Sequence, residues 1–76
     1  WRTSAGVEVD FVVEAGGKLT PIEVKLSTTP RPAMANPIRT FQEDFKGKAG
    51  KGYVVHPGDI RLPLAPNVMA MPFAEL

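Results

Sequence analysis

The hydrophobic and polar residues in the first third of the chain alternate, as they do in β-strands with two different faces. In residues 7–14, valine and phenylalanine recur at every second position, with mostly acidic residues between them. A second alternating stretch covers residues 19–26. Gly16 and Gly17 lie between the two stretches, and glycine accepts the backbone angles of a tight turn. The pattern predicts a β-hairpin over residues 7–26.

The middle of the chain changes to a helical period. Four apolar residues recur at spacings of one helical face: Met34, Ile38, Phe41 and Phe45. Asn36 is a good N-cap and Pro37 suits the first helical position, so the sequence predicts a helix over residues 37–46 that ends before Gly47. A start near Pro32 with a kink at Pro37 is the alternative.

The last third contains short apolar pieces separated by proline and glycine. Residues 52–56 predict a strand, and residues 60–76 predict an irregular, β-rich tail. Because proline cannot donate to a strand ladder, we expect the tail segments 60–64 and 68–71 at sheet edges. The whole order predicts one α+β domain, residues 1–76, with a mixed sheet and one helix packed on it.

Composition narrows the classes of function. The chain has 76 residues, no cysteine, one histidine and a formal net charge of +1. Disulfides and cysteine-based zinc sites are therefore excluded, and we expect His56 at a solvated strand end. No apolar run approaches the ~20 residues that span a bilayer, and no signal sequence is visible, so we expect a cytoplasmic protein with no membrane partner. Because the chain begins with Trp1 rather than methionine, we expect a piece of a longer protein.

The predicted hairpin brings charged residues of two strands together. A turn centred on the two glycines pairs residues whose numbers sum to about 33, which places Asp10 opposite Glu23 on one face. Lys25 shares that face. Two close carboxylates favour a cation between them, and oxygen ligands suit Mg²⁺ or Mn²⁺. The alternative is an ordinary solvent-facing strand with surface ion pairs, which stabilise a hairpin by a few tenths of a kcal/mol.

The sequence around these residues resembles a known family. Val-Asp-Phe-Val at 9–12, followed by Ile-Glu-Val-Lys at 22–25, resembles the core of the PD-(D/E)XK nuclease superfamily. More closely, residues 1–2, 6–12 and 21–25 resemble a domain of unknown function that forms the C-terminal part of many bacterial and archaeal AAA-type ATPases. This resemblance implies a restriction-endonuclease-like core, here truncated at its N-terminus because the usual first helix would precede Trp1.

The resemblance also implies roles for individual residues. Asp10 and Glu23 would be metal ligands, and Lys25 would be the catalytic lysine. The backbone carbonyl of Val24 would be a further ligand, and Glu8 an auxiliary carboxylate. The implied activity is Mg²⁺- or Mn²⁺-dependent phosphodiester hydrolysis of nucleic acid by the C-terminal domain of an ATPase.

Partners follow from the same picture. The chain has no P-loop motif, so ATP would bind only in the missing part of the parent protein, whose N-terminal ATPase domain is an expected partner. Lys46, Lys48 and Lys51 are candidate contacts to a nucleic-acid backbone, with a solvated loop as the alternative. The rival hypothesis is a catalytically inactive module for dimerisation or partner recognition. A homodimer is expected because so small a domain has few other means of stabilisation.

Overall fold

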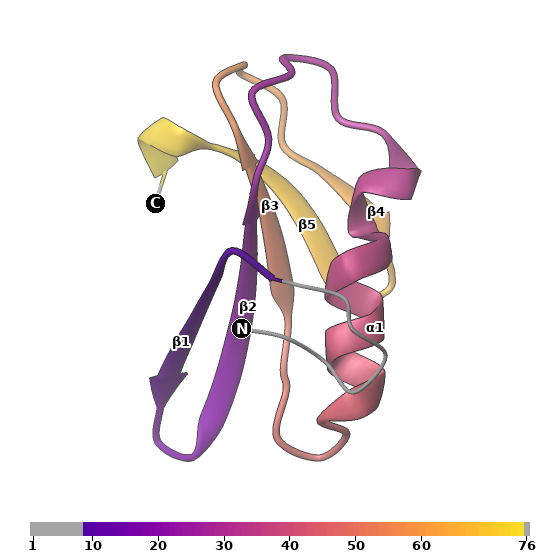
Figure 1. Ribbon diagram of the computed structural model, residues 1–76. Coiled ribbons are helices and arrows are strands. Elements are labelled where there is room, and N and C mark those ends of the chain that lie inside the picture. The colour runs from indigo at the N-terminus through magenta and orange to yellow at the C-terminus, as the bar shows by residue number, and fades with distance from the viewer. Residues whose placement is uncertain (1–8, 76) are drawn as a thin grey trace.

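The computed structural model describes residues 9–75 as one five-stranded sheet with a helix packed on it (Figure 1). The strands are β1 (Phe11–Ala15), β2 (Lys18–Val24), β3 (Gly52–His56), β4 (Leu62–Ala65) and β5 (Val68–Pro72). The helical segments are α1 (Asn36–Asp44) and two 3₁₀ turns, η1 (Pro32–Ala35) and η2 (Phe73–Glu75). The strand order is β1-β2-β3-β5-β4, with parallel pairing at β2–β3 and β3–β5 and antiparallel pairing at both edges. The predicted α+β class with a mixed sheet is confirmed.

The hairpin forms with the predicted register. Gly16 and Gly17 have φ values of 58° and 80°, which is the positive-φ pair of a two-residue hairpin turn. Phe11 pairs with Ile22, as the predicted centre of the turn requires. The first strand begins at Phe11, so it is shorter than predicted, and residues 7 and 8 lie outside the described part of the chain.

The helix is shifted relative to the prediction. It begins at Asn36 and ends at Asp44, and its N-cap is Ala35, which makes no side-chain capping hydrogen bond. The turn η1 leads directly into it, and the N–H of Asn36 donates to the carbonyl of Ala33. The helical path therefore starts at Pro32, as in the alternative prediction. Pro32 lies at the start of η1 and Pro37 at the start of α1, where a backbone N–H would have no helical partner, so the lack of this group in proline costs no hydrogen bond.

The tail is more ordered than predicted. β3 has its predicted bounds, but β5 lies between β3 and β4 rather than at an edge. Pro72 is the last residue of β5, so the missing N–H does not interrupt the ladder. Pro63 lies on the edge strand β4, beside a register shift. The expectation of an irregular tail with two edge segments was therefore wrong for β5.

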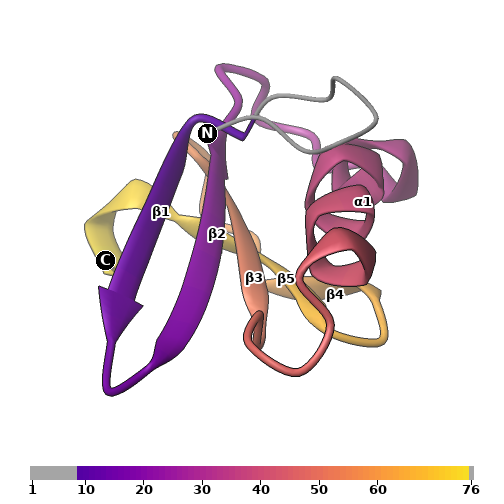
Figure 2. The ribbon, with the colours of Figure 1, turned by 60° about the horizontal axis from the view of Figure 1, so that its bottom comes forward.

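The helix covers one face of the sheet (Figure 2). One core cluster joins α1 and η1 to the β3, β4 and β5 side: Ala35, Ile38, Val54, Leu64, Val68 and Ala70. A second cluster packs Phe41 against Val9 and Leu19. A Cβ at Gly52 would clash with the side chain of Ile38, so α1 approaches β3 closely at this point.

The opposite face of the sheet is also apolar. The ladder places Phe11, Ile22, Tyr53 and Met69 in one row across four strands. Phe11 and Val13 on the edge strand are 59% and 51% exposed. Both faces of the sheet therefore carry apolar side chains, but the helix α1 packs on only one of them.

Candidate functional site

Asp10 and Glu23 interlock through two reciprocal hydrogen bonds at the end of the hairpin. The backbone N–H of Asp10 donates to Glu23 Oε1 at 3.0 Å. The backbone N–H of Val24 donates to Asp10 Oδ2 at 2.9 Å. A main-chain amide of the other segment therefore orients each carboxylate. Because both donors belong to the backbone, no flexible side chain is needed to hold either group.

A bend before β1 makes this arrangement possible. Asp10 lies in the bend, outside the regular ladder, and Val9 turns inward to 1% exposure beside Leu19 and Phe41. Val9 and Phe11 thus differ in burial, although the alternating pattern placed them on one face. Because the chain leaves the ladder at Asp10, the N–H of this residue becomes available to the Glu23 side chain.

Glu23 is a charged residue on the buried, helix-facing side of the sheet. Its neighbours across the ladder are Val54 and then Ala70, both fully buried, and Glu23 itself is 5% exposed. Burial raises the pKa of its carboxyl above the ordinary value, and repulsion from Asp10 adds to the rise. The hydrogen bond from Asp10 N–H and the attraction of Lys25 act in the opposite direction. The solvent-facing alternative is therefore wrong for Glu23.

Lys25, the residue directly after β2, completes the group. Its Nζ lies 3.8 Å from Glu23 Oε2, and its side chain is 39% exposed. Its backbone N–H donates to the carbonyl of Val55 at 2.9 Å, which extends the β2–β3 pairing past the end of β2. The ammonium group can therefore reach both the buried carboxylate and solvent.

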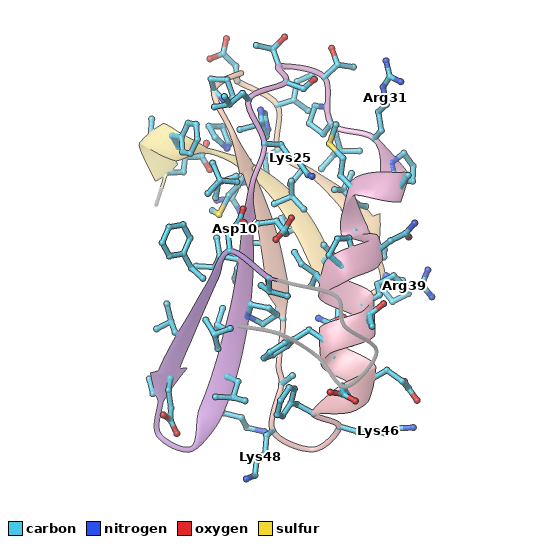
Figure 3. The ribbon with its side chains drawn as sticks, in the orientation of Figure 1. Asp10, Lys25, Arg31, Arg39, Lys46 and Lys48 are labelled. Atoms are coloured by element: carbon cyan, nitrogen blue, oxygen red, sulfur yellow. The ribbon has the colours of Figure 1, made fainter. Side chains whose placement is uncertain are left out.

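The other predicted residues do not join this group. Lys46 and Lys48 lie at the end of the molecule where α1 ends, away from Asp10 and Lys25 (Figure 3). Lys46 forms an exposed ion pair with Glu43 at 3.7 Å, and Lys51 is also exposed. Glu8 lies outside the described residues. The structure thus brings together Asp10, Glu23 and Lys25, and it places the loop lysines elsewhere.

His56 is buried, contrary to the sequence-based expectation. It is 1% exposed at the end of β3. Its Nδ1 accepts a hydrogen bond from the N–H of Gly58 at 3.1 Å, so the ring carries its proton on Nε2 and donates to the carbonyl of Ile60 at 2.7 Å. The imidazole closes the connection between β3 and β4. Its role in the fold is structural.

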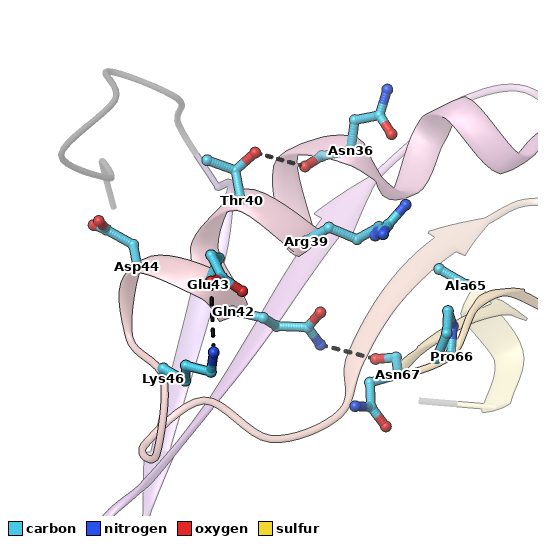
Figure 4. A pocket seen from close by; sticks show the side chains of 10 residues that line it. All are labelled: Asn36, Arg39, Thr40, Gln42, Glu43, Asp44, Lys46, Ala65, Pro66 and Asn67. Atoms are coloured by element: carbon cyan, nitrogen blue, oxygen red, sulfur yellow. Dashed lines mark hydrogen bonds and ion pairs between the residues drawn. The ribbon is translucent and has the colours of Figure 1, made fainter.

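A shallow groove of about 790 Å³ lies between α1 and the turn that joins β4 to β5 (Figure 4). Gln42 crosses this region, and its Nε2 donates to the carbonyls of Gly50 and Asn67, both at 2.9 Å. The lining carries both positive and negative side chains, including Arg39 and Glu43. The groove does not include Asp10, Glu23 or Lys25, so it is separate from the candidate site.

The side chains alone supply few metal ligands. Over residues 9–75, no group of three histidine, cysteine, aspartate or glutamate residues is placed to hold a metal ion. No helix in that part of the chain is long and apolar enough to cross a membrane. Sequence reasoning found the three site side chains but missed the amides of Asp10 and Val24, since main-chain donors leave no mark in residue type.

Comparison with known proteins places the chain in a family. Uncharacterized proteins of Mycobacterium bovis (Mb2031c) and Mycobacterium tuberculosis (Rv2008c) are each 32% identical to it over 76 residues. The match covers 100% of this chain but only 16% of each of these curated relatives. No solved structure matches the chain significantly. A family profile, "Domain of unknown function (DUF4143)", matches residues 1–76 throughout, and the chain therefore belongs to the DUF4143 family.

Proposed function

We propose that Asp10, Glu23 and Lys25 form a divalent-cation site for hydrolysis of phosphodiester bonds in nucleic acid. The observation that carries this proposal is the convergence of two carboxylates and one ammonium group on one side of the hairpin, with Glu23 buried there at a cost in stability. Perturbed, partly buried charge beside an accessible partner is typical of functional sites. The resemblance to the PD-(D/E)XK pattern supports the same assignment.

The donor set fits Mg²⁺ or Mn²⁺. Asp10 Oδ2 and Glu23 Oε1 accept main-chain hydrogen bonds, so the second oxygen of each carboxylate is the proposed ligand, and the cation would share Glu23 Oε2 with Lys25, whose Nζ lies 3.8 Å from it. A positive ion there would offset both the burial of Glu23 and its repulsion from Asp10. Mg²⁺ commonly binds through one or two carboxylates and keeps several waters, so the lack of a third side-chain ligand is compatible with it. The Val24 carbonyl and Glu8 remain proposed additional ligands.

The carboxylates of Asp10 and Glu23 and the ammonium group of Lys25 would have different roles in the reaction. The hydrogen bonds from the main chain orient the two carboxylates, which would lower the ordering cost of binding a cation through their second oxygens. Lys25, held near Glu23 but open to solvent, would hold a negative phosphoryl oxygen or orient a water. A bound divalent cation would add charge stabilisation at the phosphoryl group and lower the pKa of a coordinated water.

Amide chemical shifts test this site directly. The N–H groups of Asp10 and Val24 donate to the two proposed ligands, so Mg²⁺ binding should shift both signals, and Mn²⁺ should broaden them first. Asp10→Asn should abolish the effect, whereas Glu14→Gln, a change in an exposed acid on β1, should retain it. If neither amide responds to millimolar metal in the unmodified chain, the proposal is wrong. Cleavage of single- and double-stranded DNA and RNA, with Asp10→Ala as control, then tests the reaction.

The second candidate is a non-catalytic module for recognition or dimerisation. The reciprocal hydrogen bonds favour it, because they give Asp10 and Glu23 a structural task in closing the hairpin. This candidate predicts no amide response to metal and no cleavage, and it predicts that Asp10→Ala affects only stability. In either case, contacts with an ATPase part of a longer protein are a proposal based on the resemblance, since the relatives are much longer than this chain.

A further inference from the structure

In the part of the chain that the structure describes, the edge strand β1 has no strand paired on its outer side, and it carries exposed apolar side chains. β1 is the first strand in the sheet order and pairs only with β2 among the described strands. Phe11 is 59% exposed and Val13 is 51% exposed. Native sheets normally protect an edge with lysine, proline, a bulge or a covering element, because unpaired main-chain groups attract another strand. The sequence of β1, Phe-Val-Val-Glu-Ala, contains neither lysine nor proline.

We propose that β1 pairs in antiparallel fashion with β1 of a second copy of this chain, about a two-fold axis at Val13. Such pairing would join two five-stranded sheets into one continuous sheet. The ladder row of Met69, Tyr53, Ile22 and Phe11 would continue with Ala15 of the second copy. The apolar face of the sheet would therefore extend across the junction.

The charges along the strand exclude the registers centred on the two neighbours of Val13, and an axis at Ala15 would pair strand residues with the turn glycines Gly16 and Gly17. In a two-fold antiparallel pair, side chains directly opposite each other point to the same face, and like charges in that position are destabilising. An axis at Val12 would place Asp10 of each copy opposite Glu14 of the other. An axis at Glu14 would place the two Glu14 side chains opposite each other. The axis at Val13 places Glu14 opposite Val12 and Asp10 opposite Gly16, so no like charges face one another.

The size of the contact sets the expected affinity. Two five-residue strands bury less than the roughly 1,200 Å² of a standard interface, so the dimer should be weak and concentration-dependent. Sedimentation equilibrium of the chain from about 10 μM to about 1 mM should therefore show a reversible monomer–dimer equilibrium. Val13→Lys should weaken dimerisation by at least about tenfold, because two ammonium groups would meet at the axis. Ile60→Lys is the matched control, since Ile60 is 48% exposed but lies in a loop.

Cross-linking tests the register. The chain has no cysteine, so one introduced thiol reports one position. Directly opposite residues of paired strands lie within the Cα separation that a disulfide bridges. Val13→Cys should therefore form a covalent dimer rapidly under mild oxidation, and Glu14→Cys and Ile60→Cys should form it slowly. Faster cross-linking through Glu14→Cys would overturn the register.

Two other results would overturn the pairing itself. One is a monomer at every concentration together with Val13→Cys cross-linking no faster than Ile60→Cys. The other is a monomer whose β1 amides become protected from hydrogen exchange only when the chain is extended by further sequence, which would show that another segment occupies the edge. The metal titration of Asp10 and Val24 is independent of these outcomes, so failure of the dimer and failure of the proposed function can be distinguished.

Discussion

Replacing Glu23 by glutamine should stabilise the fold at neutral pH and remove metal binding. Glutamine keeps the size of the side chain and an oxygen that can accept the Asp10 N–H, now 3.0 Å from Glu23 Oε1. It removes the buried negative charge, whose pKa is raised first by burial and then by Asp10. The variant thus separates the cost of the charge from the benefit of the hydrogen bond.

The direction of the pH effect follows from linkage. A carboxyl whose folded pKa is raised holds its proton more tightly in the folded state than in the unfolded state. The stability associated with the protonated Glu23 is fully present below its ordinary pKa of 4.5 and is lost as pH rises through the folded value. The free energy of unfolding of Glu23→Gln minus that of the parent chain should therefore be greater at pH 7 than at pH 4.

Glu23→Ala gives the size of the hydrogen-bond contribution. Alanine removes the acceptor and leaves the part-buried Asp10 N–H without it, which costs about 1–3 kcal/mol. In a domain of this size, that difference corresponds to roughly 4–24 °C in Tm. Urea unfolding of the parent, Glu23→Gln and Glu23→Ala at both pH values measures the two effects separately. Glu14→Gln, a substitution of an exposed acid on β1 measured at the same two pH values, is the control.

Metal should stabilise the parent chain relative to Glu23→Gln at neutral pH. A cation at ten times its Kd stabilises the folded state by about 1.4 kcal/mol. For this small domain the gain corresponds to about 6–11 °C in Tm. The parent chain should show this gain with Mg²⁺, and Glu23→Gln should show none. A parent chain more stable than Glu23→Gln at pH 7 without metal, with a difference that does not change with pH, would refute the reasoning about the buried charge.

Three further substitutions test the packing. His56→Leu should destabilise by about 2–4 kcal/mol, because it leaves the Gly58 N–H and a loop carbonyl without their ring partners. Gly52→Ala should cost about 1–3 kcal/mol through its clash with the helix, whereas Gly50→Ala, with open space around it, should be nearly neutral in the same urea titrations. Gln42→Glu should lower Tm more than Gln42→Ala, since a carboxylate would face two main-chain carbonyls; equal melting temperatures would contradict that assignment.

The hairpin and its register were predictable because both depend on local sequence. The two glycines determine the turn, and the turn determines which residues pair, so the proximity of Asp10 to Glu23 follows from the sequence once the strands are recognised. The bend at Asp10 was not predictable in this way. It depends on Val9 reaching Leu19 and Phe41, and Phe41 lies far along the chain.

The tail and His56 depend on pairing that is more distant still. β5 becomes an interior strand only because it lies parallel to β3, and no local pattern distinguishes an interior strand from an edge strand in so short a segment. His56 is buried because the connection after β3 folds back over it and offers one donor and one acceptor. A single polar residue before proline is compatible with either a solvated or a buried position, so residue type alone favoured the wrong one.

The face of the hairpin that is buried depends on chain connectivity as well as on hydrophobicity. Ile22 and Val24 share one face of β2 with Lys18 and Thr20, and the helix lies on the other face, which holds Leu19, Pro21 and Glu23. β2 and β3 are parallel neighbours joined through α1, and such crossovers are right-handed in nearly all proteins. A preferred hand of the connection and the packing of Leu19 on Phe41 both favour a helix on this face. Glu23 is buried on this face with the Asp10 amide and Lys25 as its partners, and the metal dependence of stability tests whether a cation joins them.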